Sequence, residues 1–187
     1  NIWDIKGRHK AKMANERGQR AFCMGGSAPS ASNVNDFISI NTKGDAVDFG
    51  DLIAATNNFG ACANTIRAFY GGGYSGGYVN TIGSFVTSSL GNAADFGDLS
   101  VTRAYLGSGV ANNVRGLWAG GWISPAVTNI MDYITFASFG NATDFGDLGG
   151  GDTQGPSGVC SPTRGVWMGG NPGSGNNSST DIGYITI

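Results

Sequence analysis

Short apolar runs, each closed by turn residues, follow one another along most of the chain. One continuous apolar run ends in a glycine pair, as in RGLWAGG at 115–121. An alternating run comes next, as in NIMDYITF at 129–136, and is followed by ATDFGDL at 142–148. Runs of this length bounded by glycine and asparagine are typical of β-strands. The pattern therefore predicts an all-β protein.

Three of these markers recur with a period of about 48 residues, which indicates an internal repeat. The pattern R-[AG]-φ-[CYW]-x-G-G, in which φ is apolar, begins at Arg20, Arg67, Arg115 and Arg164, at spacings of 47, 48 and 49 residues. An alternating run with an aromatic residue follows each arginine, at 36–40, 83–87, 132–136 and 183–187. The sequence D-F-G-D-L then occupies 48–52, 95–99 and 144–148.

Each unit is predicted to contain four short strands. In the third unit they lie near 107–111, in RGLWA, in NIMDYITF and in ATDFGDL, and Asn112-Asn113 suits a tight hairpin with positive φ. The second and third strands are apolar on both faces, so we expect sheets that are covered on both sides. The units are predicted as 6–52, 53–99, 100–148 and 149–187 of a single domain that spans 1–187.

The order of these strands resembles the blade of kelch-type β-propellers, and the period falls in the range of propeller blades. The segment GNATDFGDL at 140–148, together with the arginine motif and the alternating runs, resembles repeats in virion-associated proteins of marine tailed bacteriophages and some large algal viruses. This resemblance implies a kelch-like β-propeller of about four four-stranded blades. It also implies a virion or extracellular location, in a structural, tail-fibre-like or attachment protein whose partners are other virion proteins or a host-surface protein or glycan.

The N-terminal residues 1–5 align with the last strand of a unit, because Asp4 lies 47 residues before Asp51. The fourth unit has no D-F-G-D-L sequence of its own. We therefore expect the N-terminal strand to complete the fourth blade and to close a four-bladed ring. Two chains that form an eight-bladed ring, or a longer propeller, are the alternatives, and homo-oligomerisation fits the symmetry of virion parts.

Composition agrees with a β-fold and excludes several other classes. Of 187 residues 33 are glycine and one is glutamate, and 13% are charged against roughly 25% in ordinary domains. Residues 1–20 carry a charge of +4, and the other residues carry −6. We interpret the basic segment as a solvated strand and loop, and contact with nucleic acid is the less favoured alternative. No apolar run approaches the roughly 18 residues that cross a bilayer, so membrane insertion is not expected.

No catalytic, metal or cofactor site is predicted. D-F-G also occurs in kinases, but it recurs here without the other kinase motifs. A catalytic or calcium-binding pair is needed once, whereas the Asp-x-x-Asp pairs recur, so we expect them to bind turn amides: Asp48 and Asp51, Asp95 and Asp98, Asp144 and Asp147. The periodic arginines are expected to pair with carboxylates or strand carbonyls rather than to face an anionic ligand. His9 is the only histidine. Cysteines 23, 62 and 160 are predicted to be buried free thiols.

The segments after the glycine pairs differ in length and content from unit to unit. They occupy 27–35, 74–81, 122–129 and 171–181. Binding residues are often carried by loops on a rigid scaffold. Tyr74, Tyr78 and Trp122 are the aromatic residues of these loops and are the candidate ligand-binding residues, suited to a protein partner or a glycan. The sequence therefore favours a non-enzymatic attachment module, with a lectin-like carbohydrate-binding propeller as the alternative.

Overall fold

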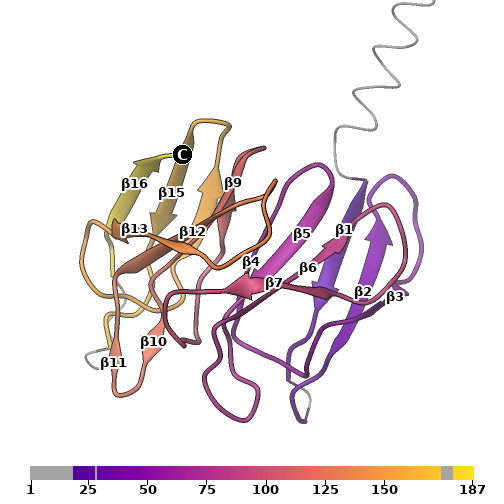
Figure 1. The fold of residues 1–187 in the computed structure, drawn as a ribbon, viewed down its shortest axis with the longest axis horizontal. Coiled ribbons are helices and arrows are strands. Elements are labelled where there is room, and N and C mark those ends of the chain that lie inside the picture. Colours follow the sequence, from indigo (N-terminus) through magenta and orange to yellow (C-terminus); the bar gives the residue numbers. More distant parts are fainter. Residues whose placement is uncertain (1–18, 28, 174–178) are drawn as a thin grey trace, which may run out of the picture.

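The computed structural model describes residues 19–27, 29–173 and 179–187, and all regular secondary structure in them is β-strand (Figure 1). Every strand pairing is antiparallel. The predicted all-β class is confirmed.

Four sheets follow one another in chain order. The first contains β1, β2 and β3 (Arg20–Met24, Val34–Ser39 and Val47–Asp51). The second contains β4, β5, β6 and β7 (Gly60–Ala63, Arg67–Gly71, Thr81–Val86 and Ala94–Asp98). The third contains β8, β9, β12 and β13 (Val110–Ala111, Arg115–Ala119, Ile130–Thr135 and Thr143–Asp147). The fourth contains β14, β15 and β16 (Ser157–Cys160, Arg164–Met168 and Ile182–Thr186), and β10 and β11 (Trp122–Ile123 and Ala126–Val127) form a separate hairpin.

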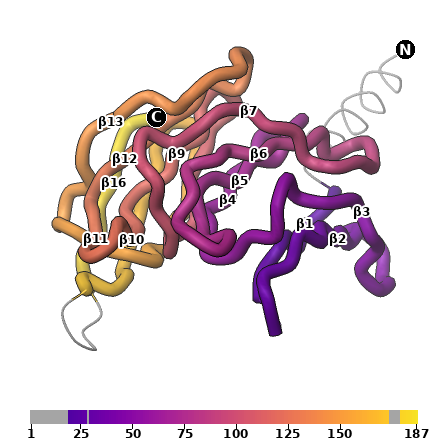
Figure 2. Tube along the Cα trace, turned by 60° about the horizontal axis from the view of Figure 1, so that its bottom comes forward, coloured from indigo at the N-terminus to yellow at the C-terminus, as the bar shows by residue number. Residues whose placement is uncertain are grey.

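The sheets lie in a row, with the first and the fourth at opposite ends (Figures 1 and 2). The second and third sheets have the four strands that the repeat predicts, whereas three strands are described in each end sheet. The first strand predicted for the unit 6–52 and the closing strand predicted at 1–5 both fall on residues outside the described ranges. A ring of blades closed by the N-terminal strand therefore stays a prediction, and the described residues form an open row.

A polar side chain holds the hairpin that precedes each arginine strand of the second, third and fourth sheets. The side-chain oxygen of the first turn residue accepts hydrogen bonds from the backbone amides two and three residues later, at 2.7–3.3 Å; these turn residues are Asn64, Asn112 and Ser161. The positive φ expected for Asn112 and Asn113 is wrong, since neither has one. The side chain of Asn112 stabilises the turn in its place.

The D-F-G-D sequences form the outer strands β3, β7 and β13, and each contains a β-bulge. The first aspartate of each accepts a hydrogen bond from the glycine amide two residues later, at 2.8–3.0 Å; the aspartates are Asp48, Asp95 and Asp144. The strand register shifts opposite each bulge, and the bulge glycines Gly50, Gly97 and Gly146 have φ of +143°, +150° and +117°. This positive φ explains the glycine, because a side chain there would strain the backbone.

Two of these outer strands also hold the next sheet. The amides of Gly91 and Ala93 donate to the carbonyls of Phe49 and Asp51, at 2.9 and 2.7 Å, and the amide of Asp51 donates to the Asn92 side chain at 3.0 Å. The segment 140–142 binds β7 in the same way. The G-N-A sequence is thus a clamp between neighbouring sheets.

The glycine pairs receive a carbonyl from the linker that leads to the next sheet. The amide of the second glycine donates to this carbonyl at 2.8–3.1 Å; the three pairs of partners are Gly26 with Thr56, Gly73 with Arg103, and Gly121 with Thr153. A Cβ atom on the first glycine would overlap the same oxygen, for example at 2.6 Å between Gly72 and the Arg103 carbonyl. The next linker residue then pairs with the residue that follows the glycine pair of the next sheet, as between Ala104 and Trp122 at 2.7 and 3.1 Å. Each linker therefore joins two sheets through backbone hydrogen bonds.

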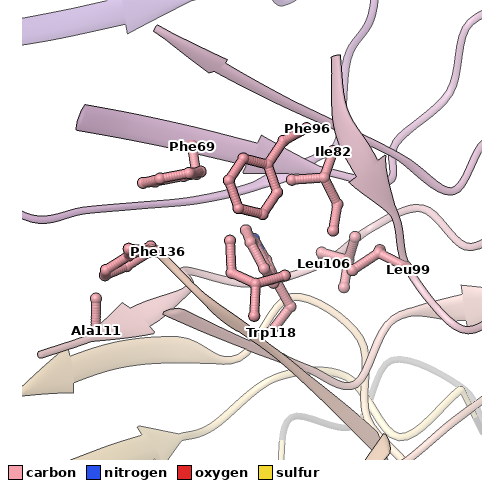
Figure 3. Close-up of a cluster of buried hydrophobic side chains, with 9 residues drawn as sticks. Phe69, Ile82, Phe96, Leu99, Leu106, Ala111, Trp118 and Phe136 are labelled. Atoms are coloured by element: carbon pink, nitrogen blue, oxygen red, sulfur yellow. The ribbon is translucent and has the colours of Figure 1, made fainter. Parts of the chain in front are cut away.

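Apolar side chains fill the space between the sheets. Between the second and third sheets, Phe69 stacks on Phe136 with ring centroids 4.5 Å apart, and Phe96 and Trp118 pack beside them (Figure 3). Strands β5 and β9 are covered on both faces, as predicted. The same expectation is wrong for β1 and β15 at the ends of the row, where alternate residues are exposed.

We predict that Gly72→Ala destabilises the protein more than Gly76→Ala does. Both glycines have positive φ, +66° and +76°, so both substitutions carry a backbone cost of about 1–2 kcal/mol. Only at Gly72 does the new Cβ meet neighbours, whereas nothing lies within 4 Å at Gly76. We expect an extra loss of at least about 2 kcal/mol in the free energy of unfolding by urea, in line with overpacking at a rigid contact. Equal losses in the two variants would contradict the role assigned to the linker carbonyl.

Candidate functional site

The variable segments after the glycine pairs lie at one end of the strands. In each sheet the segment leaves the arginine strand at its glycine end and leads to the strand that pairs with it: β1 to β2, β5 to β6, β9 to β12 and β15 to β16. Because the sheets follow one another with the same strand order, these connections gather along one edge of the row. Figure 1 shows this edge at the bottom, marked by the β10–β11 hairpin.

Tyr74 and Tyr78 come together on the second of these loops. Their rings lie 5.7 Å apart in a T-shaped arrangement, and Tyr74 is 40% exposed. The backbone of Tyr74 exchanges two hydrogen bonds with Asn57, of 2.8 and 3.1 Å. The pair is therefore fixed to the scaffold while part of its aromatic surface faces the solvent.

Trp122 lies at the start of the β10–β11 hairpin, which connects β9 to β12 of the third sheet, and is half-buried. In the described part of the chain it makes no ring contact with either tyrosine. The three candidate residues therefore share one edge of the molecule but do not form one aromatic cluster.

Two larger hollows lie away from these loops. A groove of about 400 Å³ lies beside β4, β14 and the segment that precedes β8, and its lining residues are uncharged: Phe59, Ala61, Leu106, Gly107, Ser108, Gly155, Pro156 and Ser157. A hollow of about 520 Å³ lies between the first and second sheets, where Arg20 donates a hydrogen bond of 2.8 Å to the Thr87 carbonyl. Neither contains a cluster of acids, bases and nucleophiles that would suggest a reaction.

The periodic arginines lie against aromatic rings. Each guanidinium carbon is 4.5–5.6 Å from a ring centroid; the pairs are Arg20 with Phe37, Arg67 with Phe139, Arg115 with Tyr133, and Arg164 with Tyr184. Arg20 also has the carbonyl partner described above. None of the four pairs with a carboxylate among the residues that the structure describes. Cation–π stacking is thus their common interaction, and it needs no ligand.

The acidic residues of the D-F-G-D strands do not gather into a metal site. Among the described residues no group of three or more histidine, cysteine or acidic side chains could hold a metal ion. The first aspartate of each strand is used by the bulge, and the second contributes its backbone to the clamp in β3 and β7. His9 lies outside the described residues.

A buried ion pair between Arg103 and Asp132 was not predicted from the sequence. Both side chains are fully buried and their charged atoms are 3.0 Å apart. Arg103 also donates to the carbonyls of Ile130 and Trp118, at 3.1 and 3.4 Å, and Asp132 accepts from the Ser100 amide at 3.1 Å. Burial lowers the pKa of Arg103 from its ordinary value, and the Asp132 carboxylate opposes this effect. The only signal in the sequence is an arginine that lies outside the repeated motif.

The three cysteines are free, but the prediction that all are buried is wrong. Cys23 is exposed on the face of the first sheet that no other described sheet covers, Cys160 is exposed at the end of β14, and Cys62 lies between the second and third sheets. Burial raises the pKa of the Cys62 thiol above its ordinary value.

No protein-family model matches this chain, and a search of curated proteins finds no significant match. In the part of the chain that the structure describes, there is no helix long and apolar enough to cross a membrane.

We predict that Asp132→Asn lowers the free energy of unfolding by about 3–5 kcal/mol, because it leaves the buried Arg103 charge without a counter-charge. The amide keeps the size of the side chain and an acceptor for Ser100. Arg115→Met is the control, because this substitution removes only the stacking on Tyr133. It should lower the free energy of unfolding by urea by less than about 1 kcal/mol. A second variant, Arg103→Met with Asp132→Leu, should recover much of the loss. Similar stabilities for Asp132→Asn and Arg115→Met would show that the pair is not needed.

We expect two of the three thiols to react quickly with a disulfide reagent at neutral pH. Cys23 and Cys160 are exposed, whereas the raised pKa of Cys62 leaves little thiolate, so Cys62 should react at least about tenfold more slowly. The slow phase should be absent in the Cys62→Ala variant. In the unmodified protein unfolded by urea, Cys62 should react as fast as the other two thiols. Three equally fast thiols in the folded protein would contradict this placement of Cys62.

Proposed function

We propose that this chain is a kelch-like β-propeller module of a virus particle, which binds a host-surface protein or another virion protein through the variable loops at one edge of its sheets. The proposal is for a binding and structural role without catalysis.

The arrangement of the inner strands supports the propeller part of the proposal. In a propeller the innermost strand of each blade faces the central channel. Here β4, β8 and β14 are the first strands of three consecutive sheets, and β8 contacts both of the others. A groove of about 400 Å³ lies beside them, lined by Ala61 of β4, Ser157 of β14 and residues 106–108 just before β8. We assign this groove to the central channel.

The observation that carries the binding role is the contrast between scaffold and loops. The same backbone hydrogen bonds recur at the glycine pairs and linkers of successive sheets, so the scaffold is repeated and closely held. The loops that follow the glycine pairs differ in length and sequence, and one of them presents the partly exposed pair of Tyr74 and Tyr78. Variable loops on a repeated scaffold favour recognition of a partner. The viral context rests on the resemblance of the repeats alone.

A lectin-like role is the second candidate. The T-shaped pair of Tyr74 and Tyr78 offers an aromatic face beside hydroxyl groups, and Gly76 and Gly77 next to it leave space for a ligand. Aromatic side chains with one apolar and one polar end suit the mixed surface of a sugar. A protein partner is favoured because the described loop residues do not form an enclosed pocket around these rings.

Immunogold labelling of purified particles, with antibodies raised against this chain, tests the viral role. We expect label on intact particles, and absence of the protein from them would exclude the proposal. Binding of the chain to separated particle proteins and to a glycan array then distinguishes the two candidates.

The double variant Tyr74→Ala/Tyr78→Ala should weaken this binding at least about tenfold, because aromatic anchors often contribute more than 1.4 kcal/mol. Leu90→Ala is the matched control, since Leu90 is also exposed but lies in the β6–β7 turn at the other end of the strands. Equal loss in both variants would remove the loop edge as the binding surface.

A further inference from the structure

One contact between sheets is formed three times within the chain. Each sheet has one face that bears the apolar third residue of the arginine motif. In this contact, that face packs on the opposite face of the next sheet. Phe22 of the first sheet packs on Ala68 and Phe85 of the second, and Leu117 of the third packs with Trp167 and Ile185 of the fourth. The second and third sheets meet in the same way through Phe69 and Phe136.

The fourth residue of the arginine motif lies on the face toward the preceding sheet. Trp118 donates a hydrogen bond of 2.9 Å to the Gly60 carbonyl of the second sheet, and Trp167 donates one of 3.0 Å to the Ser108 carbonyl next to the third. In the first sheet this position is Cys23, which is exposed. The contact therefore has two different halves. One half bears the third residue of the arginine motif, and the other half bears the fourth.

The first sheet exposes the half of this contact that bears the fourth residue of the motif, and we call this surface the head face. Strand pairing places Ile38 at the position of Phe85 in the second sheet. Phe85 is 5% exposed because the first sheet covers it, whereas Ile38 is 43% exposed. Ala21 and Cys23 are exposed on the same face.

The fourth sheet exposes the half that bears the third residue of the motif, and we call this surface the tail face. Ile182 pairs with Met168 as Met131 pairs with Ala119 in the third sheet. Met131 is 3% exposed because the fourth sheet packs near it, whereas Ile182 is 70% exposed. Tyr184, Val159 and Met168 are exposed on the same sheet face, and together they form an apolar surface.

We propose that the tail face of one chain packs on the head face of a second copy of the same chain. A second copy is the fitting occupant because the two faces are the two halves of the contact that already joins its neighbouring sheets. They lie at opposite ends of the row, so one described set of four sheets does not bring them together (Figures 1 and 2). Such a contact is heterologous: two copies close a ring if the rotation permits, and further copies extend a row if it does not.

This inference is independent of what the loops bind, because the end faces and the loop edge are different surfaces. Failure to label virus particles would leave it standing, and a monomeric chain would overturn it without affecting the loops.

Sedimentation velocity of the full 187-residue chain over a range of concentrations tests the proposal. Unmodified chains are expected to form dimers or larger species. Ile38→Asp on the head face and Ile182→Asp on the tail face should each raise the dissociation constant at least about 100-fold, since each places a carboxylate in an apolar contact. Ile66→Asp is the matched control, because Ile66 is 61% exposed in the β4–β5 turn and on neither end face.

A mixture of the two variants gives the decisive result. Ile38→Asp keeps its tail face and Ile182→Asp keeps its head face, so an equimolar mixture should form a heterodimer and nothing larger. Ala21→Arg and Val159→Arg provide a second pair if either aspartate variant loses its circular dichroism signal. A monomeric unmodified chain, a variant that still forms dimers alone, or a mixture that stays monomeric would each overturn the proposal.

Discussion

The structure depends on the approach of a linker carbonyl to a pair of glycines. The carbonyls of Thr56, Arg103 and Thr153 each accept the amide of a second glycine, and each lies where a Cβ on the first glycine would be. Glycine is therefore required twice at each site, once for positive φ and once for space. Because the next residue of each linker pairs with the residue after the glycine pair of the following sheet, one short segment sets the distance between two sheets. The packing of aromatic rings between the sheets follows from this spacing.

The repeated positions serve the same geometry with different chemistry. The fourth residue of the arginine motif approaches preceding backbone as tryptophan in two sheets, where it donates, and as Tyr70 in the second, where its hydroxyl accepts from the Ile53 amide at 2.9 Å. The arginines likewise find a ring within their own sheet at Arg115 and in the next sheet at Arg67. Variation of this kind keeps the contact between sheets while it changes the side chains, which is how a repeat can diverge without loss of fold.

The same principle separates the surfaces on which binding is proposed. Backbone clamps leave the loops after the glycine pairs free to vary, so recognition of a partner can change there without disturbing the scaffold. The end faces are different, because they carry the apolar residues that the repeat uses for its own packing. An apolar face of this kind is a liability for a lone chain unless it is covered. The open ends and the variable loops thus set two separate demands on the protein.

The repeat, the all-β class, the turns at the glycine pairs and the bulge aspartates follow from the sequence by itself, because each is a local backbone requirement that the chain states at every period. Only the tertiary structure decided which side chains are buried and which charged groups find a partner. Arg103 of a linker and Asp132 of β12 meet although Arg103 lies outside the repeated motifs, and Arg67 stacks on a ring 72 residues away. Cys23 and Cys62 have similar apolar neighbours along the chain, but only Cys62 has a sheet on each side. Burial and charge pairing depend on which surfaces meet across the row of sheets, and a sequence that repeats the same unit does not show where that row has its ends.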